Sequence, residues 1–391
     1  MVDDSTVKID LTLPWAAFPS SFLAGPNAWM RAPAMLAAGP EGSKNPIGTG
    51  PFKFESWESN TSLKVVKNPD YWREGEPHLD QIEFFPITDD ISRVNALQSG
   101  DIDMMLSASA DDAADLDGEY TVIRDWDTET TLLLANTRPT AGGAPNPLSN
   151  EHARKAVAHA TDPKAVAQLV GQDIEIPFSP FSAENPWGDP SVSDSYPAYD
   201  LEKAKEEVAK YKEETGEPTL SVTLLGPSDT GTVAQMQTVQ QQWSEAGIDS
   251  KIDAMDYNAF SLRGVQGNFQ LIYGPIFSAP DPDQNYHFWS ETTVAEDGAI
   301  GINFSAFAND ETQAALTTGR ESQDFDERKQ AYADLIREQN KAAINIWLYF
   351  TPYSLVASDR VHGLQMADEL PFGNFQPKTW WGQVWVGDPS A

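Results

Sequence analysis

Two aspartates and several aromatic residues meet in the stretch Leu271–Trp289, LIYGPIFSAPDPDQNYHFW. It begins as an apolar run typical of a buried β-strand and ends in a Pro/Asp loop rich in aromatic side chains. Loops held by a rigid scaffold often carry binding residues, and flat rings offer a large contact area to a solute. We therefore expect this stretch to lead from a strand into a binding crevice.

The individual side chains of this stretch allow more than one interpretation. Asp281 and Asp283 are candidate solute contacts, but an aspartate beside a proline is ordinary turn chemistry, and we favour the turn. Tyr273 and Phe277 share one strand face, because side chains alternate with a period of two. This pair could belong either to the core or to the binding crevice.

The elements that must position the stretch are predicted by the segment from Thr219 onward. TLSVTLL, IDSKIDAM and Phe269–Phe277 have the composition of strands, and Val233–Ala246 and Tyr257–Val265 have the pattern of helices. This order is βαβαβ, the half-unit of a doubly wound sheet. Ligands of such sheets bind outside the carboxyl ends of the strands, which is where the Pro/Asp loop leaves its strand.

Other elements follow from periodicity and capping residues. We expect strands at residues 6–13, 52–57, 63–67, 130–136 and 344–350, and helices at 151–160, 162–170, 201–214, 310–319 and 326–341. QIEFFPI, a helix from Asp89 or Asp90 to Gly100, and a strand at 101–106 predict a βαβ unit with a parallel pair. Residues 111–120 are expected to be an exposed, irregular connection.

A composition shift at RPTAGGAPNPLSN marks the predicted change of lobe. We expect residues 1–136 to form a partial first lobe and residues 137–353 a second lobe with the crevice wall. Residues 354–391, with Trp380, Trp381 and Trp385, would return to the first lobe. Two crossings, near Asn136 and near Tyr353, would form a hinge.

Composition excludes several classes of function. The chain has 26 Lys and Arg against 59 Asp and Glu, a formal net charge of −33, which repels nucleic acid and anionic lipid. It has no cysteine, no apolar run of membrane-spanning length, and no N-terminal features of a signal peptide. We expect a cytosolic protein or a chain that starts after its targeting segment.

Catalytic motifs give no support for an enzyme. The five histidines lack the HExxH spacing, and no GxSxG elbow is present. A pair of catalytic carboxylates, as in glycosidases, stays open because such a pair is defined by its separation in space.

Several stretches together resemble one family. NPIGTGPFKFESWE, NPDYWREGEPHLDQIEFFPITDDISRVNALQSGDIDM, NPLSNEHARKAVAHATDPKAVAQLV and the DPDQNY loop are similar, in this order, to the extracellular solute-binding proteins, family 5, of ABC importers. The resemblance implies an α/β, type II periplasmic-binding-protein fold with two doubly wound lobes. It also implies a C-terminal portion whose first lobe is incomplete.

The same resemblance implies the function. A family member captures a peptide or other small polar solute in an interlobe cleft and delivers it to membrane permease subunits. We expect a monomer without cofactor, metal or nucleic-acid partner, located outside the cytoplasm and lipid-anchored in its full-length form. The alternatives are an oligosaccharide-binding importer protein, a carbohydrate-active enzyme, and a signalling or scaffold protein with the same lobes.

The resemblance also assigns candidate contacts residue by residue. Peptide binders of the family hold the α-amine with an aspartate four residues before the proline of the DPD loop, where this chain has Ser278. A neutral serine cannot form that charge-assisted bond, which lowers the case for peptides with a free amino end. Tyr257, Trp187 and Tyr349 resemble aromatics that line the family's cleft, and Asn303 is a polar candidate.

Overall fold

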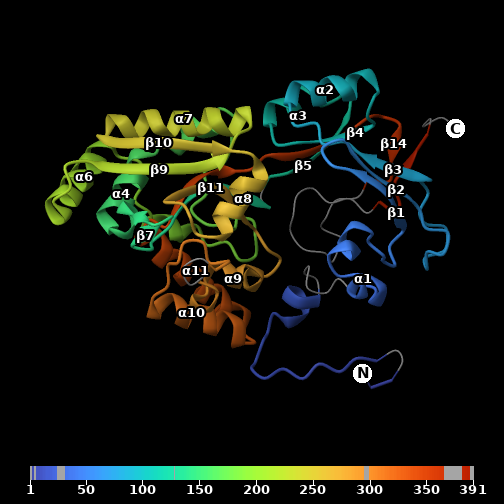
Figure 1. Cartoon of the computed structure of the whole chain (residues 1–391), viewed down its shortest axis with the longest axis horizontal. Helices are drawn as coiled ribbons and strands as arrows, with labels where there is room; N and C mark the ends of the chain where they lie inside the picture. The colour runs from blue at the N-terminus through green and yellow to red at the C-terminus, as the bar shows by residue number, and fades with distance from the viewer. Residues whose placement is uncertain are drawn as a thin grey trace. The chain divides into compact units, whose positions relative to one another are not determined.

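The computed structural model describes residues 2–3, 6–23, 31–126, 128–294, 299–364 and 381–387 (Figure 1). The chain divides into two compact units, each built from separate segments. Unit 1 comprises residues 1–24, 127–169 and 173–351, and unit 2 comprises 25–126, 170–172 and 352–391. The division after residue 126 precedes the expected change of lobe, and the first 24 residues belong with the second large segment.

Unit 1 contains a five-stranded mixed sheet in the order β10-β9-β11-β6-β12. Its strands are β6 Glu129–Ala135, β9 Leu220–Pro227, β10 Ile248–Met255, β11 Leu271–Phe277 and β12 Asn345–Phe350. β9 pairs in parallel with β10 and with β11, as the βαβαβ pattern predicted. β6 pairs antiparallel with β11 and with β12.

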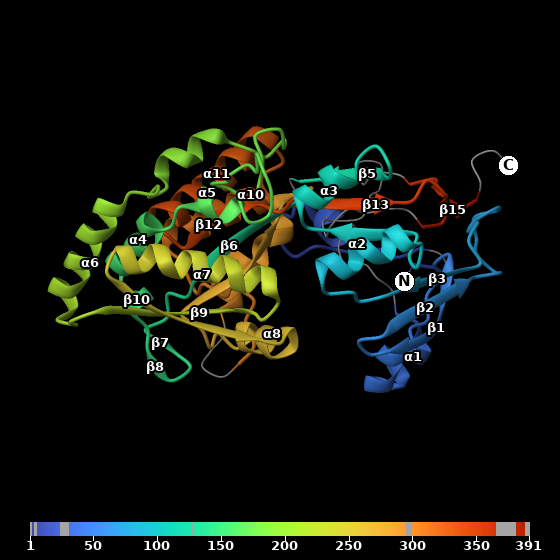
Figure 2. The same ribbon diagram turned by 90° about the horizontal axis from the view of Figure 1, so that it is seen from above.

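The longer helices of unit 1 are those expected, although the helix expected from Val233 begins at Thr230 and the helix expected over 162–170 ends at Ala167. Asp229 caps α7 (Thr230–Glu245) by accepting a 2.8 Å bond from the amide of Thr232, and Asp256 caps α8 (Tyr257–Val265). α7 lies along β9 and β10 (Figure 2). The further helices of this unit are α4 Glu151–Ala160, α5 Pro163–Ala167, α6 Leu201–Thr215, α9 Tyr286–Trp289, α10 Asp310–Glu321 and α11 Phe325–Lys341.

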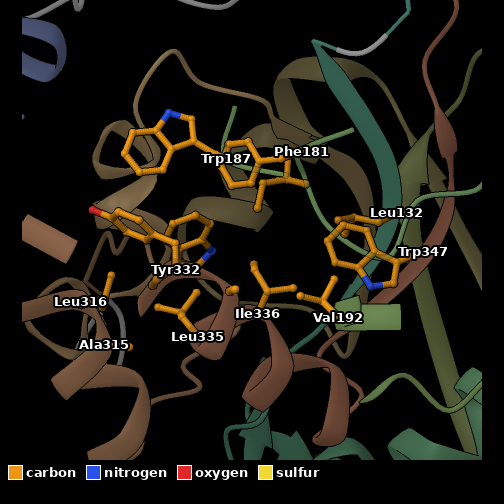
Figure 3. Packing of buried hydrophobic residues seen from close by; sticks show 13 residues of the cluster. Leu132, Phe181, Trp187, Val192, Ala315, Leu316, Tyr332, Leu335, Ile336 and Trp347 are labelled. Carbon is orange, nitrogen blue, oxygen red and sulfur yellow. The ribbon is translucent and has the colours of Figure 1, made fainter. Parts of the chain in front are cut away.

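One core of unit 1 is a cluster of buried aromatic and aliphatic side chains (Figure 3). It joins the sheet to α10 and α11, and burying each large apolar side chain contributes about 1.5–3 kcal/mol. The buried members are Leu132, Phe181, Trp187, Val192, Ile276, Trp289, Ala315, Leu316, Tyr332, Ala333, Leu335, Ile336 and Trp347.

Unit 2 contains two three-stranded sheets whose strands pair antiparallel, ordered β1-β2-β3 and β4-β13-β5. The strands are β1 Phe52–Glu58, β2 Ser62–Lys67, β3 Gln81–Phe84, β4 Met104–Ser107, β5 Thr121–Asp125 and β13 Tyr353–Ala357. The described residues of this unit contain no parallel strand pair, so the doubly wound arrangement expected for both lobes stays a prediction for this part of the chain.

The predicted parallel pair around α2 (Asp90–Ser99) is wrong. The helix itself is correct, with Asp89 as N-cap and Gly100 at φ 80° as C-cap. β3 and β4 flank α2 in sequence but join different sheets. β4 pairs with β13, which follows it by about 250 residues, and periodicity alone carries no signal for a partner so distant.

Two further expectations fail because tertiary contacts decide the local structure. Residues 111–120 contain helix α3 (Ala110–Leu116), in which Ala113 and Leu116 are buried despite the acidic sequence. Residues 6–13 form no strand. Their alternating pattern lacks a neighbouring strand among the described residues, and Val7 and Leu13 are each 68% exposed.

The remaining elements are short. Unit 2 contains α1 Pro33–Ala37 and a pairing of β14 (Val361–His362) with β15 (Trp385–Val386), while Trp380 lies outside the described residues. Unit 1 has the two-residue strands β7 and β8 at 140–141 and 144–145. Single-turn and related helices are η1 Phe18–Leu23, η3 Gly39–Lys44, η4 Pro147–Ser149, η5 Pro190–Ser195, η6 Pro282–Asn285 and η7 Glu291–Thr293.

Candidate functional site

The 278–289 loop follows the carboxyl end of β11, at the edge of the sheet where the parallel strands β9 and β10 also end. It folds into η6 and α9. Asp281 caps η6, since its Oδ1 accepts a 3.0 Å bond from the amide of Asp283. The side-chain amide of Asn285 donates to the carbonyl of Phe277 at 2.7 Å and ties the two ends of the loop together.

Asp281 is held by a buried ion pair. Nη2 of Arg328 lies 2.7 and 2.8 Å from its two carboxylate oxygens. The guanidinium also donates from Nε to the carbonyl of Gly319 at 2.7 Å and lies over the ring of Trp187. Both oxygens of Asp281 are thus engaged inside the protein, in addition to the turn that its sequence context predicted.

Asp283 is paired in a similar way. Its carboxylate accepts from Nε and Nη2 of Arg320 at 2.8 and 3.2 Å, and from the indole Nε1 of Trp15 at 2.6 Å. The side chain of Asp283 is completely buried. The two acidic side chains of the loop therefore act as internal anchors, each neutralised by an arginine from the helical layer.

Ser278 is the first residue of this loop, and Trp187 contacts the loop near its start. Ser278 is buried, its amide donates to the carbonyl of Thr128 at 2.9 Å, and its Oγ accepts from Nδ2 of Asn185 at 3.1 Å. Trp187 is also buried and donates from Nε1 to the carbonyl of Pro280 at 2.9 Å. Trp187 therefore packs against the loop from the core.

Tyr273 and Tyr349 belong to one hydrogen-bonded group on the sheet. Their hydroxyl oxygens are 2.9 Å apart, and each lies 2.7 Å from Oε1 of Gln235 on α7. Burial is the largest cause that raises the pKa of Tyr273 well above its ordinary value, and the neighbouring Tyr349 raises it further. Burial likewise raises the pKa of Tyr349. Both hydroxyls therefore stay neutral at physiological pH and can donate and accept.

This group continues toward Glu129, the first residue of β6. Thr131 and Thr351 share a hydrogen bond of 2.8 Å between their hydroxyls, and Thr351 donates to Oε1 of Glu129 at 3.1 Å. All three residues are buried. A polar group of this kind is stable only when its members are satisfied, so it fixes the side chains at this edge of the sheet.

Three further candidates are Phe277, Tyr257 and Asn303. Phe277 is half-buried at the end of β11, and its carbonyl accepts the bond from Asn285. Tyr257 is the first residue of α8 and is 71% exposed, so its ring is available to solvent. Asn303 is fully buried. Its Nδ2 donates to the carbonyl of Ser290 at 3.1 Å, and its Oδ1 accepts from Oγ of Ser305 at 2.8 Å. These bonds give Asn303 a structural task.

Five residues of this arrangement were not among the candidates: Trp15, Asn185, Gln235, Arg320 and Arg328. No sequence spacing links them to the loop, because their contacts cross separations of 37 to 268 residues. The excess of acidic residues is the one available signal. It indicates that an arginine of this chain is paired with a carboxylate, but not with which one.

Within the described part of the chain, no group of His, Asp and Glu side chains is arranged to hold a metal ion. The same residues include no helix that is both long and apolar enough to cross a bilayer.

The mixed α/β architecture matches the fold of solved periplasmic binding proteins. The fold of DppA from Helicobacter pylori, solved with the peptide STSA, matches with a TM-score of 0.84 at 21% identity, covering 99% of this chain and 73% of that chain. The agropinic acid complex of AgaA from A. tumefaciens matches with a TM-score of 0.80 at 22% identity, covering 97% and 75%.

The chain belongs to the bacterial extracellular solute-binding proteins, family 5, whose middle region matches residues 1–297. This confirms the resemblance seen in the sequence. The glutathione-binding protein GsiB of Pectobacterium atrosepticum is 27% identical over 376 residues, 92% of this chain and 68% of that protein. GsiB of Salmonella typhi is 27% identical over 351 residues, 85% and 64%. The chain thus spans about two thirds of the length of these relatives.

Proposed function

We propose that this chain is the solute-binding component of an ABC importer, which captures a small polar solute outside the cytoplasm and delivers it to permease subunits. Membership of family 5 over residues 1–297 carries the proposal. The sheet of unit 1 supports it, since ligands of α/β sheets bind beyond the carboxyl ends of parallel strands, where the 278–289 loop lies.

The solute that we propose is of the size of a short peptide and is held at this loop without a charged anchor. Asp281 and Asp283 are both engaged by arginines, and Ser278 is neutral and bonded to Asn185. Glutathione is the natural first probe, because curated relatives at 27% identity are glutathione-binding proteins. Recognition would then use neutral hydrogen bonds and aromatic contact.

Within the site, we assign direct contact to the candidates nearest the sheet edge: Ser278, Phe277, Tyr273 and Tyr257. Asp281, Trp187, Asn303 and Tyr349 are assigned a structural role, because they are buried and their polar atoms are engaged within the protein. Ser278 and Tyr273 also have partners within the protein, and we assign them to contact because of their positions directly after and within β11. We further propose that units 1 and 2 correspond to the two lobes of the family and close on the solute, and that a longer form carries a lipid anchor.

Calorimetric titration with glutathione and with N-acetylglutathione tests the solute class. We expect the two compounds to bind with affinities within about threefold of each other, because both carboxylates of the loop are bound by arginines and neither is available to the ammonium group of glutathione. An oligosaccharide, maltotriose, tests the alternative that the exposed ring of Tyr257 stacks on a sugar. Binding of maltotriose with no binding of either glutathione form would favour that alternative.

The variant Ser278→Asp sharpens the test. A carboxylate at this position would supply the charge-assisted bond that the family's peptide binders use, worth roughly 1.5–3 kcal/mol. We expect Ser278→Asp to gain about tenfold or more in preference for glutathione over its acetylated form. Ser278→Ala is the matched neutral control. A strong loss on acetylation in the unsubstituted protein would contradict the proposed solute class.

A further inference from the structure

The segment Trp15–Ser21, here called the N-terminal strap, docks on the 278–289 loop although about 260 residues separate them in sequence. The indole of Trp15 donates to Asp283 at 2.6 Å. Nε2 of Gln284 donates to the carbonyl of Ser20 at 2.9 Å. Within the strap, Ala17 is 1% exposed, so the segment is packed rather than merely adjacent.

Arg320 links the strap to the loop a second time. Its guanidinium lies between two aromatic rings, with Cζ 4.9 Å from the centroid of Trp15 and 3.4 Å from that of Tyr286. Its backbone carbonyl accepts a 2.8 Å bond from the amide of Ala16. Its side chain binds Asp283 at the same time. Arg320 thus contacts Asp283, the rings of Trp15 and Tyr286, and the backbone of the strap at the same time.

The position of Asp283 depends on this arrangement. The carboxylate is fully buried, so it must keep strong donors around it. Trp15 supplies one donor and also covers the guanidinium that supplies the others. Asp283 lies in η6, and Asn285 at the end of the same turn is bonded back to Phe277, beside Ser278. A shift of Asp283 would therefore be transmitted to the start of the loop.

We propose that Trp15 is a positioning residue, which through Asp283 and Arg320 holds the 278–289 loop in a single conformation. The consequence for solute affinity rests on the proposed function, whereas the effect on the loop does not. The strap belongs to unit 1, whereas the described residues 31–126 belong to unit 2, so the chain contacts the loop before it leaves unit 1.

Hydrogen exchange followed by mass spectrometry, on the full chain, tests the proposal directly. Trp15→Phe keeps a ring over Arg320 and removes the indole donor. We expect amides of residues 278–289 to exchange about tenfold faster, while those of β9 and α11 exchange as before, since local opening reports local stability. We also expect the dissociation constant for glutathione to rise about tenfold.

Two further variants keep the result decisive. Arg320→Lys retains the charge but loses the fork and the stacking, so it should loosen the same amides. Trp57→Phe, at a tryptophan that is 61% exposed on β1, should change neither exchange nor affinity.

Unchanged exchange at 278–289 in Trp15→Phe would overturn the proposal, as would an equal rise throughout unit 1. A looser loop with unchanged glutathione affinity would overturn the role of Trp15 in the site and leave the proposed function standing. Failure of the unsubstituted protein to bind glutathione would count against the proposed function, and the exchange result would still decide the role of the strap.

Discussion

Arg328 binds Asp281 through Nη2, which lies 2.7 and 2.8 Å from the two carboxylate oxygens, and the two side chains are 9% and 7% exposed. Arg328→Met leaves the carboxylate buried and uncompensated. We expect it to lower the free energy of unfolding by about 3–5 kcal/mol. Urea unfolding followed by circular dichroism measures this loss.

An exposed pair provides the control for this prediction. Lys8 and Asp10 are 2.7 Å apart but 69% and 76% exposed, so Lys8→Met should cost less than about 1 kcal/mol. The double variant Arg328→Met with Asp281→Asn should recover part of the loss, because the unpaired charge is then removed. A loss below about 1 kcal/mol in Arg328→Met alone would contradict a buried pair.

The tyrosine pair predicts a stability that falls at high pH. Burial raises the pKa of Tyr273 above that of an unfolded tyrosine, so the folded protein keeps this proton while the unfolded chain loses it. The stabilising contribution is complete below about pH 10 and is lost as the pH rises toward the folded pKa. Tyr273→Phe should reduce the slope of unfolding free energy above pH 10 by about 1.4 kcal/mol per pH unit.

Urea unfolding at several pH values between about 9 and 11 measures that slope. Tyr257→Phe, at a tyrosine that is 71% exposed, is the matched control for removal of a tyrosine hydroxyl. Equal slopes in the unsubstituted protein and in Tyr273→Phe would show that Tyr273 ionises alike in both states.

The net charge of −33 predicts stabilisation by salt. Like charges on the folded surface repel one another, and added ions shorten the range of this repulsion. We expect the thermal unfolding midpoint to rise as sodium chloride is increased from about 0.05 to about 1 M, where the Debye length falls to about 3 Å. Sucrose at matched osmolarity controls for general solute exclusion. A midpoint that is insensitive to sodium chloride would argue against charge repulsion.

The backbone around Gly188, beside Trp187, leaves no room for a side chain at this position. A Cβ at this position would lie 2.0 Å from the backbone oxygen of Ser182, so Gly188→Ala should cost about 1–3 kcal/mol or more. Gly274→Ala is the control, because a Cβ on Gly274 meets nothing within 4 Å and should be tolerated or slightly stabilising. Urea unfolding distinguishes them, and equal stability of the two variants would contradict the close contact at Gly188.

The sequence predicted those parts of the fold that depend on short-range signals. The βαβαβ order of unit 1 follows from periodicity, and α2 follows from Asp89 and Gly100 at its ends. The pairing of β4 with β13 and the burial of α3 depend on partners far along the chain, which no local pattern encodes. Acidic composition made residues 111–120 look exposed, but Leu116 faces a core.

For the candidate site, the sequence predicted the position of the loop but not the residues that contact it. The position of the 278–289 loop after β11 follows from the strand order, and its role as the binding site stays a prediction. The partners of the loop could not be predicted, because an arginine on α10 or α11 looks the same in sequence whether it faces solvent or Asp281. Trp187 and Asn303 are both buried. Residue type alone could not predict this, because an aromatic ring or an amide suits a core as well as a binding surface.

The position of β6 has a consequence for how unit 1 folds. It lies between β11 and β12, yet the ribosome makes it long before Leu271 and Asn345. A nascent chain that ends before Asn345 holds a strand with an open edge, and unpaired edges favour aggregation. The five-stranded sheet is therefore complete only once β12 has been made, and its many distant pairings predict slow folding.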